Sequence, residues 1–451
     1  MFKRLLIFMS IFLCCQAYGS ELDNHVLIFA RYGFNRDFAD ILRLPPENIQ
    51  VIAKASSVSP EDLEKNRSRY GAIHLIEDYD HSADVTLKLE EIFASGFKAD
   101  RITYTSELDV VRARVAAHRH GLIGGMPKED ILVYRDKSIM KKYATSKGIL
   151  TPDFASVSCI DDILGFIKDY NIQQENGDFV PPIVLKDDFG VGSEKIFIFK
   201  NRDELNHYLT DNSKVFGTQP TSRLIVEKFV QGRVYHIDAL IGEQGDVLFV
   251  WPSLYMDPPL AVVNEGKSRG DYVMRPNNSL TLRLNDYAKS LMGDFPTLPG
   301  GAIHLEVFVT PEDDILLCEI AARVGGGRLS DTWMQAFGFS IDEQILKIQA
   351  GIPLTIDFAN KVPSILAGGI LFPSNGKYLI SGEPPVHANL VDFKQYQKAG
   401  DLSNKPKFLG DLFATALVLG TTEEEIEENI KDIITQFHTK YQFSDSLEKA
   451  D

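Results

Sequence analysis

The sequence predicts a small α/β domain at the N-terminus, followed by a larger α+β region that is richer in strands. Runs of apolar residues at 26–30, 49–52 and 72–76 alternate with helix-like stretches, which is typical of a small parallel sheet. Strand patterns become more frequent between about residues 126 and 351. The length of 451 residues corresponds to roughly three domains.

Turn and capping signals place the domain boundaries. Gly124 to Pro127 ends the first domain, so we expect domains at residues 20–125, 126–352 and 353–451. Asp136 is expected to cap the first helix of the second domain. Near the C-terminus, Thr421 and Glu424 form a capping-box pattern before a helical stripe of apolar residues: Ile426, Ile430, Ile433 and Phe437.

Composition excludes several classes of protein. The 47 Lys and Arg residues against 63 Asp and Glu residues give a net charge of −16, and no run is rich in Lys or Arg. Nucleic acid and anionic membranes are poor partners for such a surface. The mean hydropathy is −0.10, and no apolar run reaches the roughly 20 residues that a membrane span needs, so an integral membrane protein is not expected. Four cysteines are too few for a disulfide-built scaffold.

The N-terminus has the pattern of a signal peptide. Lys3 and Arg4 precede an apolar run at residues 5–15, and Ala17 to Gly19 provide small residues at the spacing of a cleavage site. We therefore expect residues 1–19 to be a cleaved signal, which implies export. The alternative is a mis-assigned start codon, with the domain beginning at His25.

A glycine-containing connection follows the apolar run at residues 183–185. Lys186 ends that run, and Gly190, Gly192 and Ser193 precede a second strand pattern at 196–199. Glycines allow backbone N–H groups to approach phosphate oxygens, and Lys186 would supply a positive charge. A hairpin with a glycine turn explains the same residues. The P-loop motif is absent, so the chain is not a P-loop enzyme.

Two adjacent strand patterns, at 303–309 and 315–320, place two glutamates opposite each other. If the turn is centred on residues 312 and 313, Glu306 faces Glu319 on one side of the hairpin. Opposed carboxylates are destabilising unless one has a raised pKa or a cation lies between them. Hard oxygen ligands favour Mg²⁺ or Mn²⁺. The alternative is a solvated sheet face that carries two unrelated glutamates.

An arginine and a glycine run follow the second of these strands. Arg323 stands four residues after Glu319, and residues 325–327 are all glycine. Such an arginine could bind a carboxylate or a phosphoryl oxygen, and the glycines would leave room for a substrate. A structural salt bridge beside a flexible loop is the alternative.

In this order, the segments resemble the ATP-grasp superfamily of carboxylate-activating ligases, from residue 25 to about residue 440. The resemblance implies a two-part ATP-grasp fold between the N-terminal α/β domain and a C-terminal α+β domain. It also implies roles for single residues. Phosphate-binding residues would be Lys137, Lys186, Gly190, Gly192 and Ser193; adenine-binding residues in the hinge segment 224–232 would be Glu227, Phe229 and Val230; metal ligands would be Glu306 and Glu319; and the catalytic residues would be Arg323 and Lys186.

The chain departs from the family pattern at two places. The glutamate that often binds the ribose after the hinge is absent near residues 232–236, so His236 becomes the candidate for that role. Two residues after the second metal-binding glutamate, Ala321 replaces the asparagine that often serves as a further ligand. One of two metal sites would then be weaker or completed by water.

The N-terminal domain and the stretch 368–372 before a C-terminal helix resemble the biotin-carboxylase-like branch, which includes the L-amino-acid ligases. This resemblance implies that ATP and Mg²⁺, or Mn²⁺, activate a small-molecule carboxylate as an acyl phosphate. An amine, with amino acids as candidate substrates, would then complete an amide or peptide bond and release ADP and phosphate. A homodimer is left open.

Three alternatives to a carboxylate–amine ligase remain at the level of the sequence. The first is an ATP-grasp protein that binds nucleotide without ligase activity, the second is a carboxylate–thiol ligase that acts on a carrier protein, and the third is an exported solute-binding protein. The indications of cellular location also disagree, because the N-terminus favours export whereas the use of ATP favours the cytoplasm.

Overall fold

The computed structural model describes residues 24–212 and 223–446. The expected signal peptide, residues 1–19, lies outside the described residues. The chain divides into two compact units. The first contains the described residues up to Gly125 together with Leu346–Leu354, and the second contains the remaining residues from Met126 onward. This division differs from the three domains expected from the sequence, in which residues 346–352 close the middle domain and residues 353–451 form a domain of their own.

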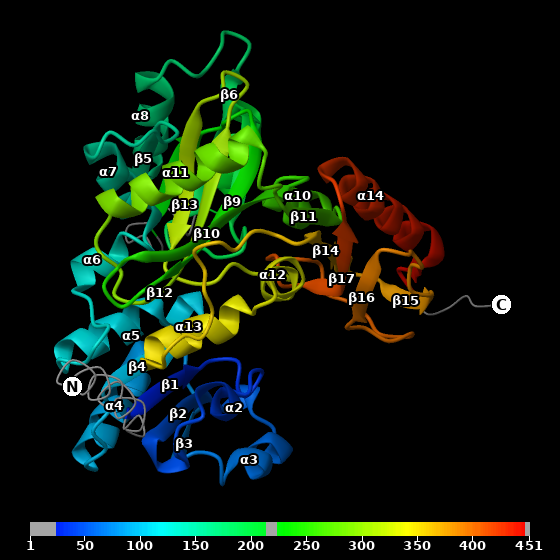
Figure 1. Cartoon of the computed structure of the whole chain (residues 1–451). Helices are drawn as coiled ribbons and strands as arrows, with labels where there is room; N and C mark the ends of the chain where they lie inside the picture. Colours follow the sequence, from blue (N-terminus) through cyan, green and yellow to red (C-terminus); the bar gives the residue numbers. More distant parts are fainter. Residues whose placement is uncertain (1–23, 213–222, 447–451) are drawn as a thin grey trace, which may run out of the picture. The chain divides into compact units, whose positions relative to one another are not determined.

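The first unit is built around a four-stranded parallel sheet with the order β3-β2-β1-β4 (Figure 1). The sequence-based prediction of a parallel α/β sheet is therefore confirmed. Its elements are β1 (Val26–Ala30), α2 (Phe38–Leu42), β2 (Ile49–Lys54), α3 (Pro60–Asn66), β3 (Ala72–Ile76), α4 (Ser82–Ala94), β4 (Arg101–Tyr104) and α5 (Glu107–Arg119).

The core of the first unit includes residues from a distant part of the chain. Every side chain of β1 is buried, which is expected for a central parallel strand covered on both faces. Leu346 and Ala350, in the last turns of α13 (Ile341–Ala350), are completely buried in the same cluster as Val26 and Ile28. Leu346–Leu354 is therefore part of the core of this unit.

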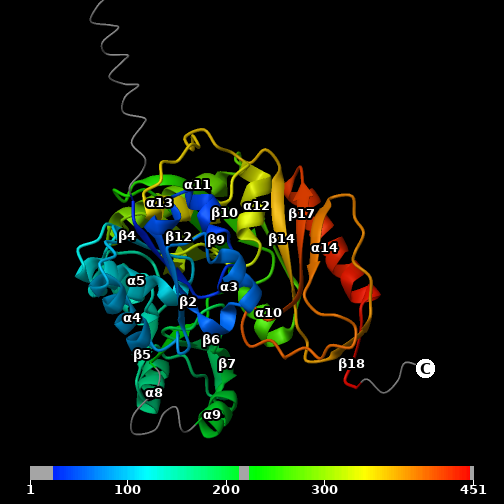
Figure 2. The same ribbon diagram turned by 90° about the horizontal axis from the view of Figure 1, so that it is seen from below.

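The second unit contains a small antiparallel sheet with the order β5-β8-β6-β7, and helices α8 and α9 lie beside it (Figure 2). The apolar faces of both helices pack on one face of this sheet, where Ile183, Leu185 and Val226 are buried. Because side chains alternate along a strand, Lys186 and Glu227 lie on the opposite face. The elements are α6 (Lys128–Leu132), α7 (Lys137–Ser146), β5 (Phe154–Val157), α8 (Ile160–Asp169), β6 (Asp178–Asp187), β7 (Ile196–Asn201), α9 (Arg202–Asp211) and β8 (Leu224–Lys228).

A larger antiparallel sheet of eight strands, with the order β13-β12-β9-β10-β11-β14-β17-β16, dominates the second unit. The strands of the C-terminal region continue this sheet, which explains why residues 355–446 do not separate from the rest of the unit. The elements are β9 (Arg233–Ile241), β10 (Val247–Tyr255), α10 (Pro259–Glu265), β11 (Arg269–Val273), α11 (Ser279–Asp294), β12 (Gly301–Val309), β13 (Ile315–Ala321), α12 (Leu329–Phe337), β14 (Leu366–Pro373), β15 (Tyr378–Ser381), β16 (Leu390–Gln395), β17 (Leu412–Gly420), α14 (Glu423–Lys440) and β18 (Gln442–Ser444).

Helices cover the large sheet with apolar side chains. Helix α11 packs on β9 and β10 (Figure 1). In α12, Trp333 and Phe337 meet Phe249 of β10 at ring-centroid distances of 5.1 and 5.0 Å. Edge-to-face contacts of this kind contribute about 0.5–1.5 kcal/mol each beyond the area that they bury. They hold the helix that follows the glycine run against the sheet.

The C-terminal helix α14 begins one residue later than expected. Its N-cap is Thr422, whose hydroxyl accepts a hydrogen bond from the backbone N–H of Glu425, so the expected capping pair Thr421 and Glu424 is wrong by one position. Both threonines suit an N-cap, and the backbone places the second one there. The predicted apolar stripe is confirmed, because all four of its residues are buried: Ile426, Ile430, Ile433 and Phe437.

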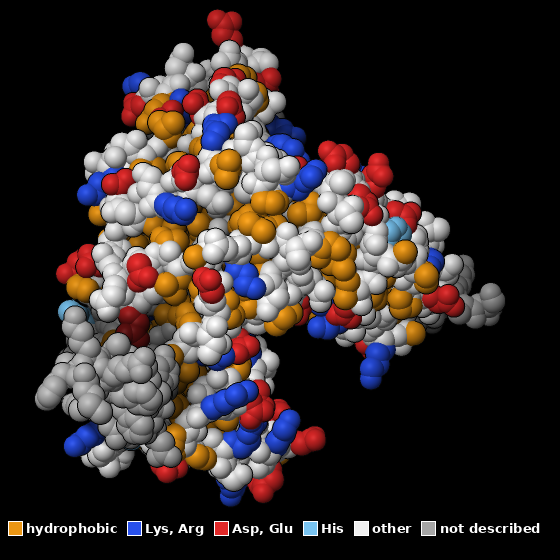
Figure 3. Space-filling view, viewed as in Figure 1, with side chains coloured by type: hydrophobic (Ala, Val, Ile, Leu, Met, Phe, Trp, Pro, Cys, Tyr) orange, Lys and Arg blue, Asp and Glu red, His pale blue; other side chains and the backbone are white. Residues whose placement is uncertain are grey.

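The surface mixes charges of both signs. Figure 3 shows acidic and basic side chains interspersed over the visible face, without a contiguous basic area on that face. Among the residues that the structure describes, no helix is long and apolar enough to cross a bilayer.

Candidate active site

The two glutamates on β12 and β13 face each other. Glu306 is the direct cross-strand partner of Glu319, as predicted. Nearer the turn, Val307 pairs with Leu317, so a bulge that contains Cys318 shifts the register by one residue. The register that pairs Glu306 with Glu319 therefore does not continue toward the turn of the hairpin. The side chains of Glu306 and Glu319 are 20% and 25% exposed, so both carboxylates remain accessible beside a buried sheet.

Glu306 is held by two neighbours on its own face of the sheet. The hydroxyl of Tyr255 donates a hydrogen bond of 3.0 Å to Oε1, and Nε2 of His304 lies 3.5 Å from the same oxygen. Burial alone would raise the pKa of this carboxyl, but the hydrogen bond and the positive charge of His304 lower its pKa to about 2. Glu306 is therefore a carboxylate, the form that a metal ion requires.

A buried network continues from Glu306 to His236. Asp238, which is completely buried, accepts hydrogen bonds from Nδ1 of His304 at 2.7 Å and from Nδ1 of His236 at 2.6 Å. Burial would lower the pKa of His304, but the charge of Asp238 raises it to about 9, while the two histidines lower the pKa of Asp238. These three residues could hold a metal by composition. Since both histidines direct Nδ1 to Asp238, we interpret the group as a network that orients Glu306.

Asp238→Asn should destabilise the protein strongly. The neutral amide would remove the charged partner of Nδ1 of His304 and leave only Glu306, 3.5 Å from Nε2, beside that positive charge. Breaking a buried ion pair from one side costs about 3–5 kcal/mol. Urea unfolding followed by circular dichroism at neutral pH would measure this loss. Asp286→Asn, at an exposed position on α11, is the matched control and should not change the midpoint. An unchanged midpoint for Asp238→Asn would show that the ion pairs of Asp238 with the two histidines do not contribute to the stability of the protein.

Lys137 connects Glu319 to the glycine-containing loop. It is the first residue of α7, whose N-cap Asp136 accepts a hydrogen bond from the N–H of Ile139. Its ammonium group lies 3.2 Å from Oε1 of Glu319 and donates a hydrogen bond of 2.7 Å to the carbonyl of Gly190. The structure therefore brings together a predicted phosphate ligand, a predicted metal ligand and the loop.

Hydrogen bonds hold the loop between β6 and β7 at two points, Asp188 and Gly192. The hydroxyl of Ser138 donates to Oδ1 of Asp188 at 2.7 Å, and the N–H of Leu409 donates to the carbonyl of Gly192 at 2.9 Å. Gly192 and Ser193 have φ values of 57° and 62°. The left-handed conformation favours glycine, and Ser193 adopts it at a cost typical of strained functional loops.

Glu227 lies between two lysines inside the second unit. Its Oε2 is 2.8 Å from Nζ of Lys186, and its Oε1 is 3.3 Å from Nζ of Lys141. Burial alone would raise the pKa of Glu227, but the two ammonium groups lower it. Burial alone would lower the pKa of Lys186, yet Glu227 raises it, whereas for Lys141 burial dominates and the pKa is lowered. Lys186 therefore forms an ion pair with Glu227, a contact that the sequence did not reveal.

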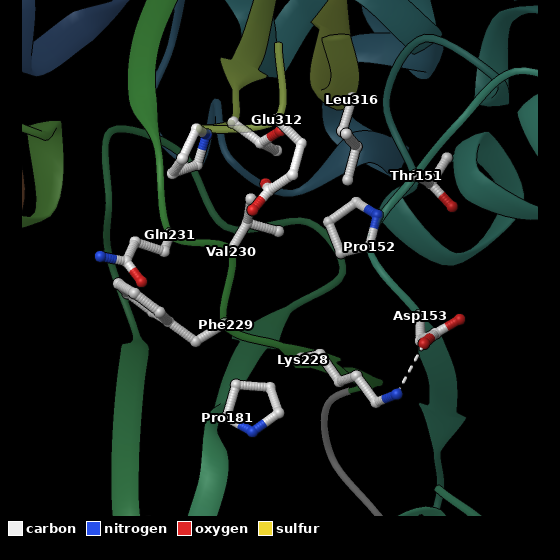
Figure 4. Close-up of a pocket in the computed structure, with 12 residues that line it drawn as sticks. Thr151, Pro152, Asp153, Pro181, Lys228, Phe229, Val230, Gln231, Glu312 and Leu316 are labelled. Atoms are coloured by element: carbon white, nitrogen blue, oxygen red, sulfur yellow. Dashed lines mark hydrogen bonds and ion pairs between the residues drawn. The ribbon is translucent and has the colours of Figure 1, made fainter. Parts of the chain in front are cut away.

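Two of the predicted adenine-binding residues line a cavity at the hinge (Figure 4). Phe229 and Val230 contribute to a space of about 340 Å³, together with Pro152 and Leu316. Lys228 is held there by an ion pair of 2.8 Å with Asp153. Glu227 does not line this cavity, because its carboxylate points into the lysine cluster instead. Of the three residues predicted to bind the base, Phe229 and Val230 therefore line the cavity, whereas Glu227 lies in the lysine cluster.

The arginines after β13 have different surroundings. Arg323 donates a hydrogen bond of 2.9 Å to the carbonyl of Val324. Its charge contributes to the lowered pKa of Glu306 and opposes the rise in the pKa of His304. It therefore lies at the end of the site that carries the metal-ligand candidates. Arg328 is buried and binds Asp392 at 2.7 Å and Thr415 at 3.2 Å, which makes it a structural tie to β16 and β17.

The residue types present fit a magnesium–nucleotide complex. Two accessible carboxylates on adjacent strands supply hard oxygen ligands, and Lys137 already places a cation beside one of them. Nε2 of His236 is buried and has no hydrogen-bond partner in the described structure, which is unusual for a buried polar atom and suits a ligand hydroxyl.

Sequence reasoning missed four residues of this arrangement: Lys141, Asp238, Tyr255 and His304. Lys141 stands one helical turn after Lys137, on the apolar side of its helix, which was a readable signal of a buried charge. His304 and Asp238 each lie two residues from a chosen candidate, and strand alternation places such residues on the same face. Tyr255 had no comparable signal, because its position depends on the pairing of β9 with β10.

Comparisons with known proteins concern the sequence and the fold of the chain. No protein-family model matches the chain. A segment of 284 residues, 61% of the chain, is 27% identical to the L-arginine-specific L-amino acid ligase of Bacillus subtilis and spans 63% of the length of that protein. The crystal structure of an L-amino acid ligase from Bacillus licheniformis matches 94% of the chain and 99% of its own length, with a TM-score of 0.68 and 17% identity.

A second solved structure places the fold within a wider group. The biotin carboxylase domain of the Hydrogenobacter thermophilus 2-oxoglutarate carboxylase, solved with MgADP, matches 93% of the chain and 90% of its own length, with a TM-score of 0.63 and 13% identity. The chain therefore has the ATP-grasp fold, and it is related in sequence to an L-amino-acid ligase. The predicted resemblance to that superfamily is confirmed.

Proposed function

We propose that the protein is an ATP-dependent carboxylate–amine ligase that forms an amide or peptide bond through an acyl phosphate and releases ADP and phosphate. The observation that carries this proposal is the facing pair Glu306 and Glu319, with Lys137 in contact with Glu319. A lysine-and-carboxylate site of this kind suits phosphoryl transfer and has no purpose in simple solute capture. The sequence relationship to an amino acid ligase supports the same reaction.

In this proposal, residues of the second unit would hold each part of a nucleotide. Lys137, Lys186 and the loop with Gly190, Gly192 and Ser193 would bind the phosphates, and Nε2 of His236 would meet a ribose hydroxyl. The base would lie against the hinge residues Phe229 and Val230, which line the cavity there. Glu306 and Glu319 would hold Mg²⁺ or Mn²⁺, which supplies charge neutralisation for the phosphates when bound.

In the first step, a carboxylate oxygen of the acid substrate attacks the γ-phosphorus of ATP, and the bond to the departing ADP oxygen breaks. In the second step, the amine nitrogen attacks the acyl carbon, loses a proton, and the bond to phosphate breaks. Arg323 would stabilise the oxyanion of the tetrahedral intermediate. No nucleophilic side chain is required.

Amino acids are the proposed substrate class for both the acid and the amine. The relative from Bacillus subtilis is an L-arginine-specific L-amino acid ligase, and a buried arginine of this chain also supports a carboxylate substrate. Arg269 lies over the ring of Tyr255 at 4.2 Å, and its Nε and Nη1 have no hydrogen-bond partner among the described residues. Asp271, 3.6 Å from its Nη2, would suit the ammonium group of the same amino acid.

The test is release of ADP from MgATP in the presence of all pairs of the twenty amino acids, with the products identified by mass spectrometry. A ligase should release ADP only with particular pairs and form the corresponding dipeptide. Hydroxylamine in place of the amine should trap the acyl phosphate as a hydroxamate. Saturable ATP binding without ADP release for any pair would favour a nucleotide-binding protein, and hydroxamate formation without any amide product would favour a thiol acceptor.

A further inference from the structure

Lys141 is a completely buried lysine near the phosphate-binding candidates. Its side chain is 1% exposed, and its ammonium group contacts Oε1 of Glu227 at 3.3 Å and the carbonyl of Leu317 at 3.3 Å. Burying an ammonium group is costly unless partners replace its water shell. A hydrophobic side chain would fill this position in α7 at lower cost, so the presence of a lysine needs an explanation.

The cluster around Glu227 holds more positive than negative charge. Lys141 and Lys186 share the single carboxylate of Glu227, one on each oxygen. All three side chains are at least nine-tenths buried. Two ammonium groups and one carboxylate leave a surplus of one positive charge, which favours the approach of an anion.

The extra positive charge is important because Lys186 can pair either with Glu227 or with a phosphate of the nucleotide. In the proposed function, Lys186 binds a phosphate of the nucleotide, and to do so its ammonium group must weaken or leave its 2.8 Å contact with Glu227. A buried carboxylate without a counter-charge is strongly unfavourable. Lys141, fixed by the carbonyl of Leu317, remains on the other oxygen of Glu227 and compensates that charge.

We propose that Lys141 is a positioning residue for nucleotide binding, which holds Glu227 so that Lys186 is free to bind phosphate. This inference rests on the proposed function. Lys141 itself would not touch the nucleotide.

The first measurement is the Kd of MgAMP-PNP, a non-hydrolysable ATP analogue, by isothermal titration calorimetry. Lys141→Met should weaken binding at least tenfold, because Glu227 would then retain Lys186 as its only counter-charge. Lys142→Met, at the exposed neighbouring position of the same helix, is the matched control and should bind as the wild type does. A wild-type Kd for a folded Lys141→Met variant would overturn the inference.

A double-mutant cycle tests whether Lys141 acts through Glu227. Without the carboxylate, Lys141 has nothing to compensate, so Lys141→Met/Glu227→Gln should bind MgAMP-PNP as Glu227→Gln does. A double variant that binds at least tenfold more weakly than Glu227→Gln would mean that Lys141 meets the nucleotide directly, and would overturn the inference. This comparison remains decisive even if Lys141→Met alone does not fold, because the double variant removes both partners of the pair.

The experiments distinguish a failure of the proposed function from a failure of the role assigned to Lys141. If the wild-type protein does not bind MgAMP-PNP at all, the proposed function fails. If the wild type binds and the cycle is additive, only the role of Lys141 fails. Thermal melting of each variant separates a loss of folding from a loss of affinity, since a purely structural role would lower Tm without coupling the two mutations in Kd.

Discussion

Lys186→Ala should reduce ADP formation by about 10²- to 10³-fold, the usual loss when one preorganised charge contact to a transferring group is removed. The protein should stay folded, because Glu227 keeps its contact with Lys141 when Lys186 is gone. The measurement is the steady-state rate of ADP release with an amino acid pair that is active in the wild type, together with a circular dichroism spectrum of the variant.

Lys200→Ala is the control for that variant. Lys200 lies on the neighbouring strand β7 and is exposed, so its replacement removes the same charge from the same sheet without touching the cluster around Glu227. It should keep the wild-type rate. Near-normal turnover by a folded Lys186→Ala variant would remove the loop between β6 and β7 from the proposed phosphate site.

Glu306→Gln and Glu319→Gln should each raise the Mg²⁺ concentration for half-maximal ADP formation at least tenfold. Even the outer partners of metal ligands contribute about 10- to 100-fold to metal affinity, and a ligand itself should contribute no less. Glutamine preserves the size of the side chain and removes only the charge. Direct titration with Mn²⁺, followed by electron paramagnetic resonance, would measure the metal affinity apart from turnover.

The two glutamine variants should differ in their secondary effects. Glu319→Gln also removes the ion pair of Lys137, whereas Glu306→Gln leaves Tyr255 and His304 beside a neutral amide. Asp314→Asn, exposed in the turn of the same hairpin, is the control and should keep the wild-type metal requirement. If either glutamine variant titrates as the wild type does, the facing-carboxylate argument fails at that position.

Local patterns predicted much of the fold. The strands at 26–30, 49–54 and 72–76 are short, apolar and separated by helices, so a parallel sheet followed from the sequence. The continuation of the large sheet through β14, β17 and β16 could not be predicted, because it depends on pairing between strands nearly a hundred residues apart, such as β11 with β14. For the same reason, the boundary expected at residue 353 did not anticipate that β14, β17 and β16 extend the large sheet.

For the candidate site, counting residues outward from the short turn between the two strands placed Glu306 opposite Glu319. It could not reveal the bulge at Cys318, whose effect on the register appears only in the hydrogen bonding. The sequence also did not reveal contacts between elements that are far apart along the chain, including Lys141 with Glu227 and Tyr255 with Glu306. The roles of the twelve candidate residues in binding and catalysis remain predictions.

The composition of the first unit limits how the protein can be dissected. A fragment that ends at Gly125 contains the whole parallel sheet but lacks Leu346 and Ala350, which are completely buried against that sheet. The missing side chains would leave an apolar opening, and each large hydrophobic residue removed from a core costs about 2–5 kcal/mol. Such a fragment would therefore be prone to aggregation. A soluble version needs the peptide 346–354 restored, through a glycine-rich linker after Gly125 or as a separate chain added in trans.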